Sequence, residues 1–304
     1  MRTGIRMRTG IIVVALVAII AAGAAYYWLM GQAPQTVQIK QKGSDTLLLL
    51  AQRWAEDYMK TNGNVEIIVS GGGSGTGISA LIGKQIDVAD ASREIKQSEI
   101  DQAKANGVNP VEWKVAIDGI SLIVNKDNPV KELTMDMLRR IYNGSVTNWA
   151  QIGGADAPII AYGRQSTSGT YVYFEEEVLK NDKYRSDMNQ LAGNAEIVQA
   201  VINDPNGIGY VGVAYAEARK DELTILSVKK TVDSTPYQPT IDNILSKKYP
   251  ISRFLYVYTN GIPEGAVKDY LKFILSSNGQ ALVEKVGYIK VPQEVLSEQL
   301  NKLR

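Results

Sequence analysis

Short apolar segments alternate with helix-like segments along much of the chain, and small polar residues separate them. The hydrophobic periodicity predicts strands at residues 36–40, 65–69, 86–89 and 158–162, and helices at 48–59, 78–82, 98–106 and 171–179. Ser98 and Asp101 fit a capping box at the start of the third of these helices. Strands that alternate with helices predict an α/β architecture with a largely parallel sheet.

Three of the four predicted strand-to-helix turns are rich in Ser, Thr and Gly, and the remaining one contributes Ser92. The turns comprise residues 43–46, 70–77, 90–93 and 163–170. In α/β folds, ligands bind outside the carboxyl ends of the strands, where the following helices present unpaired N–H groups and partial positive charge. The four turns together therefore predict a site for an oxyanion.

Two arginines strengthen this prediction. Arg164 precedes Ser168, Gly169 and Thr170, and its forked guanidinium can bind two oxygens of one tetrahedral anion. Arg93 offers the same chemistry from the third turn. The glycine run is not the phosphate loop of nucleotide hydrolases, because Ile78 stands where that motif requires Lys.

Composition removes several classes of function. The 304 residues are enough for two domains, and 33 Lys and Arg against 32 Asp and Glu give no electrostatic footprint for nucleic acid. The absence of His and Cys excludes Ser-His-Asp and Cys-His nucleophiles and imidazole or thiolate zinc sites. Asp87, Asp90 and Asp101 match no metal-binding spacing, so we expect neither a metal nor a cofactor.

An uncharged and mostly aliphatic segment covers residues 11–31. As a helix it would span about 32 Å, close to the hydrocarbon core of a bilayer. Three Arg precede it and Tyr26, Tyr27 and Trp28 lie near its far end, which predicts a transmembrane anchor with the rest of the chain outside the cytoplasm. The alternative is a signal peptide cleaved near residues 22–24, which would give a secreted or periplasmic protein.

In their order and spacing, several motifs resemble the phosphate-binding protein of phosphate ABC transporters. They are Gly43-Ser44-Asp45-Thr46, the glycine run 71–77, the segments 87–94 and 115–119, the segment 142–149, Arg164 to Thr170, and the C-terminal segments 207–212, 249–260 and 279–288. The resemblance covers nearly all of the chain beyond its N-terminal segment.

The resemblance implies a type II periplasmic-binding-protein fold, in which two α/β lobes close over one dehydrated phosphate. Residues 1–34 would be the N-terminal segment and linker, residues 35–117 with 250–304 the first lobe, and residues 118–249 the second. Crossovers would lie near 117–120 and 249–254. Such a protein is a monomeric receptor that delivers phosphate to a membrane permease and performs no covalent chemistry.

Site residues also follow from the resemblance. Matched one by one, the phosphate-binding residues would be Ser44, Thr46, Ser74, Ser92, Arg93, Arg164, Ser168, Gly169 and Thr170. Family members can carry an Asp that accepts the proton of hydrogen phosphate and so rejects sulfate, but Ser92 stands at that position here. Asp45 and Asp90 are the nearby carboxylates that can replace it, and we expect Asp45 to do so.

Several readings stay open at this stage. A receptor for another tetrahedral oxyanion, such as sulfate, molybdate or tungstate, would use the same turns. So would a membrane-tethered phosphate sensor or a phosphatase-like enzyme. A site of donors alone distinguishes phosphate from sulfate poorly, because only an unpaired acceptor penalises the wrong anion.

Overall fold

The computed structural model describes residues 19–23, 26 and 36–304, of which residues 38–304 form one compact unit. Its strands are β1 (Val37–Gly43), β2 (Val65–Ser70), β3 (Val88–Ala91), β4 (Pro110–Asn125), β5 (Glu132–Thr134), β6 (Ile160–Arg164), β7 (Asn189–Leu191), β8 (Gly207–Gly212), β9 (Leu223–Ile225), β10 (Ser227–Lys229) and β11 (Ser252–Asn260). Its helices are α2 (Leu48–Thr61), α3 (Ser74–Ile82), α4 (Gln97–Ala105), α5 (Met135–Tyr142), α6 (Gly169–Glu177), α7 (Asn194–Asn203), α8 (Val213–Glu217), α9 (Ile241–Leu245), α10 (Gly265–Leu275), α11 (Ser277–Val286), α12 (Gln293–Lys302) and the short 3₁₀ helix η1 (Trp149–Ile152).

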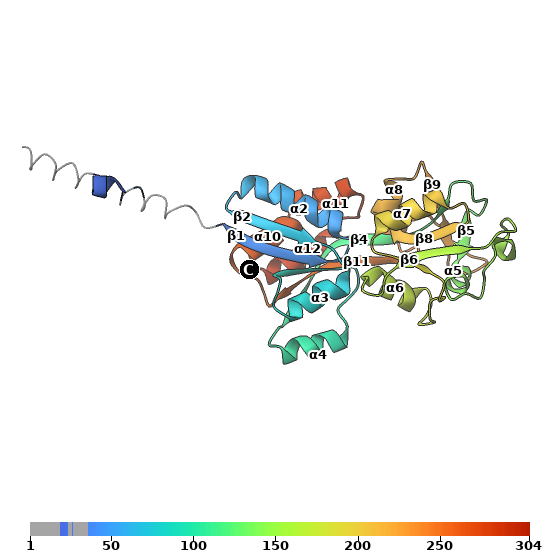
Figure 1. Cartoon of the computed structure of the whole chain (residues 1–304), viewed down its shortest axis with the longest axis horizontal. Helices are drawn as coiled ribbons and strands as arrows, with labels where there is room; N and C mark the ends of the chain where they lie inside the picture. The colour runs from blue at the N-terminus through green and yellow to red at the C-terminus, as the bar shows by residue number, and fades with distance from the viewer. Residues whose placement is uncertain (1–18, 24–25, 27–35) are drawn as a thin grey trace, which may run out of the picture. The chain divides into compact units, whose positions relative to one another are not determined.

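One sheet continues through this unit (Figure 1). Within the described residues it has nine strands in the order β2-β1-β3-β11-β4-β8-β6-β7, with β9 added beside β4. Strands β1 and β3 are parallel, and so are β6 and its neighbours β7 and β8. The sheet is nevertheless mixed rather than largely parallel, because β11 runs antiparallel to β3 and β4, and β4 runs antiparallel to β8.

The long strand β4 belongs to two halves of the sheet. Its residues 110–119 pair with β11, whereas residues 120–124 pair with β8. We call the part built on β2, β1, β3 and β11 the first lobe, and the part built on β8, β6 and β7 the second lobe. Figure 1 shows β4 and β11 passing between the two.

Each lobe has its own apolar core. In the first lobe, Trp54, Trp113 and Tyr270 are fully buried between the sheet and its helices. In the second lobe, Phe174 of α6 stacks on Tyr210 of β8 with ring centroids 4.2 Å apart. Burial of rings of this size supplies much of the apolar driving force for folding.

The start of α4 differs from the sequence prediction. The helix begins at Gln97, so Glu99 rather than Asp101 occupies its third position, and the Glu99 carboxylate accepts the Lys96 backbone N–H at 2.8 Å. The capping box predicted for Ser98 and Asp101 is therefore wrong. The displaced cap matters because Glu99 also binds Arg93.

The predicted N-terminal anchor lies for the most part outside the described residues. Of this segment, residues 19–23 and 26 are helical. Within the part of the chain that the structure describes, no helix combines the length and the apolar character needed to span a membrane.

Candidate functional site

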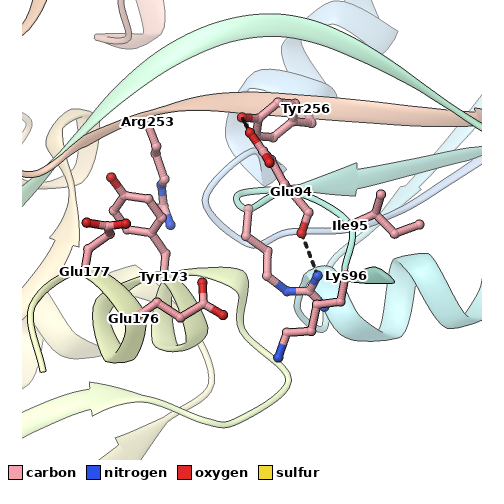
Figure 2. Close-up of a pocket in the computed structure, with 9 residues that line it drawn as sticks. Glu94, Ile95, Lys96, Tyr173, Glu176, Glu177, Arg253 and Tyr256 are labelled. Atoms are coloured by element: carbon pink, nitrogen blue, oxygen red, sulfur yellow. Dashed lines mark hydrogen bonds between the residues drawn. The ribbon is translucent and has the colours of Figure 1, made fainter. Parts of the chain in front are cut away.

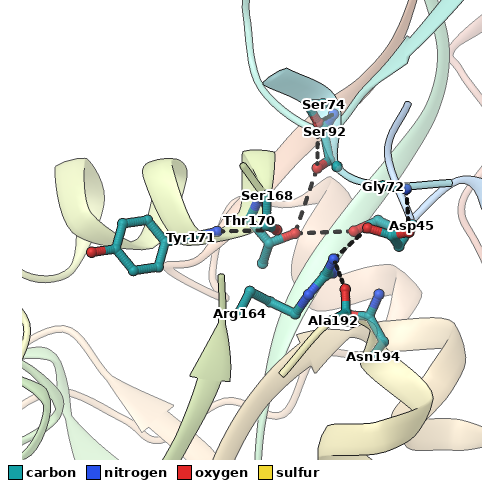
Figure 3. A network of polar contacts seen from close by, with 12 residues as sticks. Asp45, Gly72, Ser74, Ser92, Arg164, Ser168, Thr170, Tyr171, Ala192 and Asn194 are labelled. Atoms are coloured by element: carbon teal, nitrogen blue, oxygen red, sulfur yellow. Dashed lines mark hydrogen bonds and ion pairs between the residues drawn. The ribbon is translucent and has the colours of Figure 1, made fainter. Parts of the chain in front are cut away.

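Four strand-to-helix turns meet where the two lobes contact each other. The Oγ1 atoms of Thr46 and Thr170 lie 3.0 Å apart, although one threonine precedes α2 and the other begins α6. Ser92 Oγ lies 3.3 Å from Ser74 Oγ and 3.5 Å from Thr170 Oγ1 (Figure 3). Thr46, Ser74, Ser92, Ser168 and Thr170 are all buried, and we call them the hydroxyl cluster.

The hydrogen-bond pattern makes donors of two of these hydroxyls. Ser168 is the N-cap of α6, and its Oγ accepts the backbone N–H groups of Thr170 at 3.1 Å and Tyr171 at 3.4 Å. Ser74 Oγ accepts the backbone N–H of Ser92 at 3.0 Å. A hydroxyl has one proton and two acceptor lone pairs, so occupied lone pairs leave the proton for another acceptor. Both hydroxyls therefore keep a proton for another acceptor, and they lie at the positive N-terminal ends of α3 and α6.

Glycine permits the close approach of α6 to the first lobe. A Cβ at Gly169 would overlap the Ser74 hydroxyl and lie 2.8 Å from that of Ser92. Across the same interface, the Gly75 N–H donates to the Thr167 carbonyl at 3.0 Å. The first turn of α6 therefore sits directly on the first lobe's turns.

Arg164 brings a positive charge to this cluster. Its side chain is 1% exposed, and Nη2 donates to Asp45 Oδ2 at 2.5 Å and to the Ala192 carbonyl at 2.7 Å. Its Nε and Nη1 are buried, and no described residue accepts a hydrogen bond from them. Buried donors of a cation require an acceptor, and an anion beside the guanidinium can supply one to these free N–H groups.

Asp45 ties the two lobes together through its carboxylate. Oδ2 binds Arg164, and Oδ1 accepts the Gly72 N–H of the glycine run at 2.9 Å. The Asp45 carbonyl also accepts the hydroxyl of Tyr215 from α8 at 2.8 Å. These contacts fix the guanidinium of Arg164 and place one acceptor group at the edge of a site that otherwise consists of donors.

Asp90, the other predicted carboxylate, is bound elsewhere. Its Oδ1 accepts the Gln41 side-chain N–H at 2.7 Å, and Gln41 Oε1 in turn accepts the hydroxyl of Tyr270 at 2.9 Å. Burial raises the pKa of Asp90 to about 7, although the Gln41 hydrogen bond opposes the shift. The side chain of Asp90 thus belongs to the core of the first lobe, while its backbone carbonyl accepts the Ser44 N–H at 2.9 Å.

Arg93 is committed to a partner on its own lobe. Its Nη1 and Nη2 donate to the two Glu99 carboxylate oxygens at 2.8 and 2.6 Å, and Nη1 also donates to the Glu94 carbonyl. The residue borders a cavity of about 360 Å³ that Lys96, Glu176 and Arg253 also line (Figure 2). Of the predicted anion ligands, the structure thus unites the hydroxyl cluster with Arg164 and Gly169, and holds the Arg93 guanidinium on Glu99.

Ser44 remains close to the cluster through its turn. It is 2% exposed, and no group in the described part of the chain bonds to its Oγ. The hydroxyl is therefore a free buried donor beside Asp45.

Three further residues were not predicted for the site. Arg253 Nη2 donates to Thr170 Oγ1 at 2.8 Å and binds Asp118 Oδ2 at 3.0 Å. Asn194 is buried two residues after Ala192, and its Nδ2 finds no acceptor among the residues that the structure describes. A charged residue within an apolar strand run is a signal for both Asp118 and Arg253, whereas no local pattern points to Asn194.

Comparisons with known sequences identify the family of this chain. The PBP superfamily domain matches residues 31–278. The phosphate-binding protein PstS of Pseudomonas aeruginosa is 35% identical over 278 residues, which cover 86% of this chain and 85% of that protein.

Solved structures give the same result. A phosphate ABC transporter substrate-binding protein from Clostridium perfringens, solved with bound phosphate, is 31% identical to this chain. The two structures align with a TM-score of 0.76, and the alignment covers 84% of this chain and 100% of the other. An ABC-type phosphate transport receptor from Vibrio cholerae is 26% identical with a TM-score of 0.67, again covering 84% of this chain and 100% of the other.

Proposed function

Because the chain belongs to the PBP superfamily and, within it, to the phosphate-binding proteins of phosphate ABC transporters, it is an extracytoplasmic phosphate receptor, and we propose how it holds the anion. Arg164 binds phosphate through the free N–H groups of its guanidinium. The hydroxyls of Ser74, Ser168 and Thr170 and the N–H groups at the start of α6 bind the remaining oxygens. The buried Nε and Nη1 of Arg164, for which no described residue supplies an acceptor, carry this proposal.

Each lobe supplies half of the ligand shell, so phosphate favours the arrangement in which the lobes touch. The first lobe gives Thr46, Ser74 and Ser92, and the second gives Arg164 and the α6 turn. An anion bound by both halves stabilises the closed state by its differential affinity for that state. We place the lobe boundaries at the two crossovers, with residues 35–117 and 250–304 in the first lobe and 118–249 in the second.

Selectivity for phosphate over sulfate requires an acceptor, and we assign this role to Asp45. Ser92 is a hydroxyl with no charge, so it does not repel sulfate. Asp45 Oδ2 lies 2.5 Å from Arg164 Nη2, and 14% of the Asp45 side chain is accessible. A carboxylate there accepts the proton of hydrogen phosphate and repels the fully deprotonated sulfate.

The N-terminal segment determines how the receptor is held at the membrane. We propose that residues 11–31 stay uncleaved and anchor the receptor on the outer face of the membrane, beside the permease that takes up its phosphate. Three Arg before the apolar run and the aromatic residues near its end support this orientation. The mass of the native mature protein tests it, because cleavage near residues 22–24 would remove the segment.

Calorimetric titration tests the function. The full-length protein, kept in a mild detergent because of its apolar N-terminal run, is titrated with phosphate and then with sulfate. We expect saturable binding of one phosphate. Sulfate should bind more weakly by about tenfold or more, because it has no proton to donate to the Asp45 carboxylate and so loses at least one hydrogen bond. Absence of phosphate binding would overturn the function, and equal sulfate binding would overturn the role of Asp45.

A further inference from the structure

A buried ion pair connects the two crossover strands beneath the hydroxyl cluster. Arg253 of β11 lies directly opposite Asp118 of β4 in the strand register, and their side chains are 3% and 0% exposed. Asp118 Oδ2 binds Arg253 Nη2 at 3.0 Å, and Oδ1 accepts the Val213 N–H at 3.1 Å. Replacement of such a pair by apolar residues is often neutral or stabilising, so stability alone does not account for it.

Arg253 also contacts the anion site through Thr170. The same Nη2 donates to Thr170 Oγ1 at 2.8 Å. A guanidinium only donates, so this contact fixes Thr170 as an acceptor on the side of Arg253. The Thr170 proton must then point away, toward the side where Thr46 Oγ1 lies at 3.0 Å and Ser92 Oγ at 3.5 Å.

The guanidinium is held firmly enough to impose this polarity. Its central carbon lies 5.1 Å from the ring centroid of Tyr173, an arrangement in which the aromatic face attracts the cation (Figure 2). The Tyr173 hydroxyl donates to the Ser252 carbonyl at 2.7 Å, which fixes the ring beside Arg253. Asp118 therefore holds one end of the guanidinium and Tyr173 covers its face.

We propose that Arg253, held by Asp118, is a positioning residue that sets the Thr170 hydroxyl as a proton donor to the bound phosphate. The proposal rests on the proposed function, because it assigns the Thr170 proton to that anion. Without Arg253, the Thr170 hydroxyl is free to turn its proton toward Asp118 or another acceptor, and an oxygen lone pair then faces the phosphate. Arg253 thus acts on affinity through Thr170, while its buried Nε and Nη1 find no acceptor among the described residues.

A double-mutant cycle tests this coupling on the full-length protein with inorganic phosphate. Arg253→Gln and Thr170→Val should each weaken binding by about tenfold, the size expected for one hydrogen bond to a charged group. The double variant should also lose about tenfold rather than a hundredfold, because both changes remove the same donor. As a matched control, Arg253→Gln combined with Ser74→Ala should give additive losses.

A second background without the buried charges distinguishes loss of binding from a folding defect. Arg253→Gln alone leaves Asp118 buried without its partner, so the cycle is repeated with Asp118→Asn and Arg253→Gln together, which removes both charges. Non-additivity with Thr170→Val in either background supports the proposal. Additive losses in the variants that fold would overturn it, since Arg253 would then act independently of Thr170. Wild-type protein that fails to bind phosphate would instead overturn the function.

Discussion

The second lobe holds its part of the anion site on a rigid aromatic base, whereas the first lobe holds its part on three separate turns. The Arg164 backbone N–H donates to the Tyr210 hydroxyl at 3.1 Å, and Tyr210 stacks on Phe174 of α6. A single core thus supports both the guanidinium and the capped helix. In the first lobe, Thr46, Ser74 and Ser92 come from turns that follow β1, β2 and β3.

This difference separates two tasks. The second lobe carries the positive charge of the site, so it should account for most of the attraction to phosphate. The first lobe adds uncharged hydroxyls and the carboxylate of Asp45, so it should govern closure and the choice between anions.

Arg164→Ala should have the largest effect. It removes the positive charge of the site and its charge-assisted hydrogen bonding to phosphate, for which we expect a loss of roughly 1000-fold in affinity, or about 4 kcal/mol. Arg219→Ala, which breaks a surface ion pair with Glu222 on the same lobe, should leave affinity unchanged. Near-normal calorimetric affinity in Arg164→Ala would contradict the assignment of the charge to this residue.

Asp90→Asn tests whether Asp90 belongs to the core of the first lobe rather than to its binding turns. The Asp90 carboxyl keeps its proton to a pKa of about 7 in the folded state, against 3.8 in the unfolded chain. The folded state therefore binds more protons between these values, and wild-type stability falls as pH rises through the window. Since the variant has no such group, it should exceed the wild type by about 4 kcal/mol at pH 8 and match it near pH 4.

Urea unfolding at both pH values measures this difference. Asp87→Asn is the control. Asp87 is exposed directly before β3, the strand that contains Asp90, so its substitution should not raise the free energy of unfolding. Phosphate affinity should stay within about twofold in Asp90→Asn. A large loss of affinity would place Asp90 among the ligand groups and blur the distinction between core and turns.

Gly169→Ala tests whether the two lobes must touch. The new methyl group meets the Ser74 and Ser92 hydroxyls, so we expect phosphate affinity to fall on the order of 30-fold, or about 2 kcal/mol of overpacking. Because alanine is the better helix former, stability without phosphate should not fall. Gly83→Ala, at an exposed position of the first lobe, should bind normally. Unchanged affinity in Gly169→Ala would show that closure does not bring α6 against the first lobe.

Asp45→Asn should lower the selectivity for phosphate over sulfate. An amide can donate to sulfate and does not repel it, so the ratio of phosphate to sulfate affinity should fall by about tenfold. The ratio, measured by calorimetry, separates selectivity from any general loss through Arg164. Glu99→Gln, which alters the partner of Arg93, should keep the wild-type ratio. An unchanged ratio in Asp45→Asn would remove Asp45 from selectivity.

The strand-to-helix turns could be predicted because their signals are local. Hydrophobic periodicity and runs of Ser, Thr and Gly placed β1, β2, β3 and β6 and the helices that follow them. The order of the strands in the sheet could not be predicted from local patterns. Strands β4 and β11 pair over a separation of more than a hundred residues, and their antiparallel insertion makes the sheet mixed.

Side-chain partners explain the remaining differences. Arg93 and Arg164 both lie in predicted strand-to-helix turns. The register of α4 places Glu99 beside Arg93. Arg164, in contrast, keeps two buried donors for which the described residues supply no acceptor. Asp118 and Arg253 meet only through the pairing of β4 with β11, which no local motif specifies. Asp90 precedes Ser92 closely, yet strand geometry turns its carboxylate to Gln41.

A crystal structure of the protein with phosphate bound tests the central claim most directly. We predict one phosphate between the lobes, with at least one oxygen within hydrogen-bond distance of Arg164 Nε or Nη1 and the others bonded to the hydroxyls of Ser74, Ser168 and Thr170. A phosphate bound elsewhere, or one that leaves Arg164 Nε and Nη1 without a contact, would contradict the account.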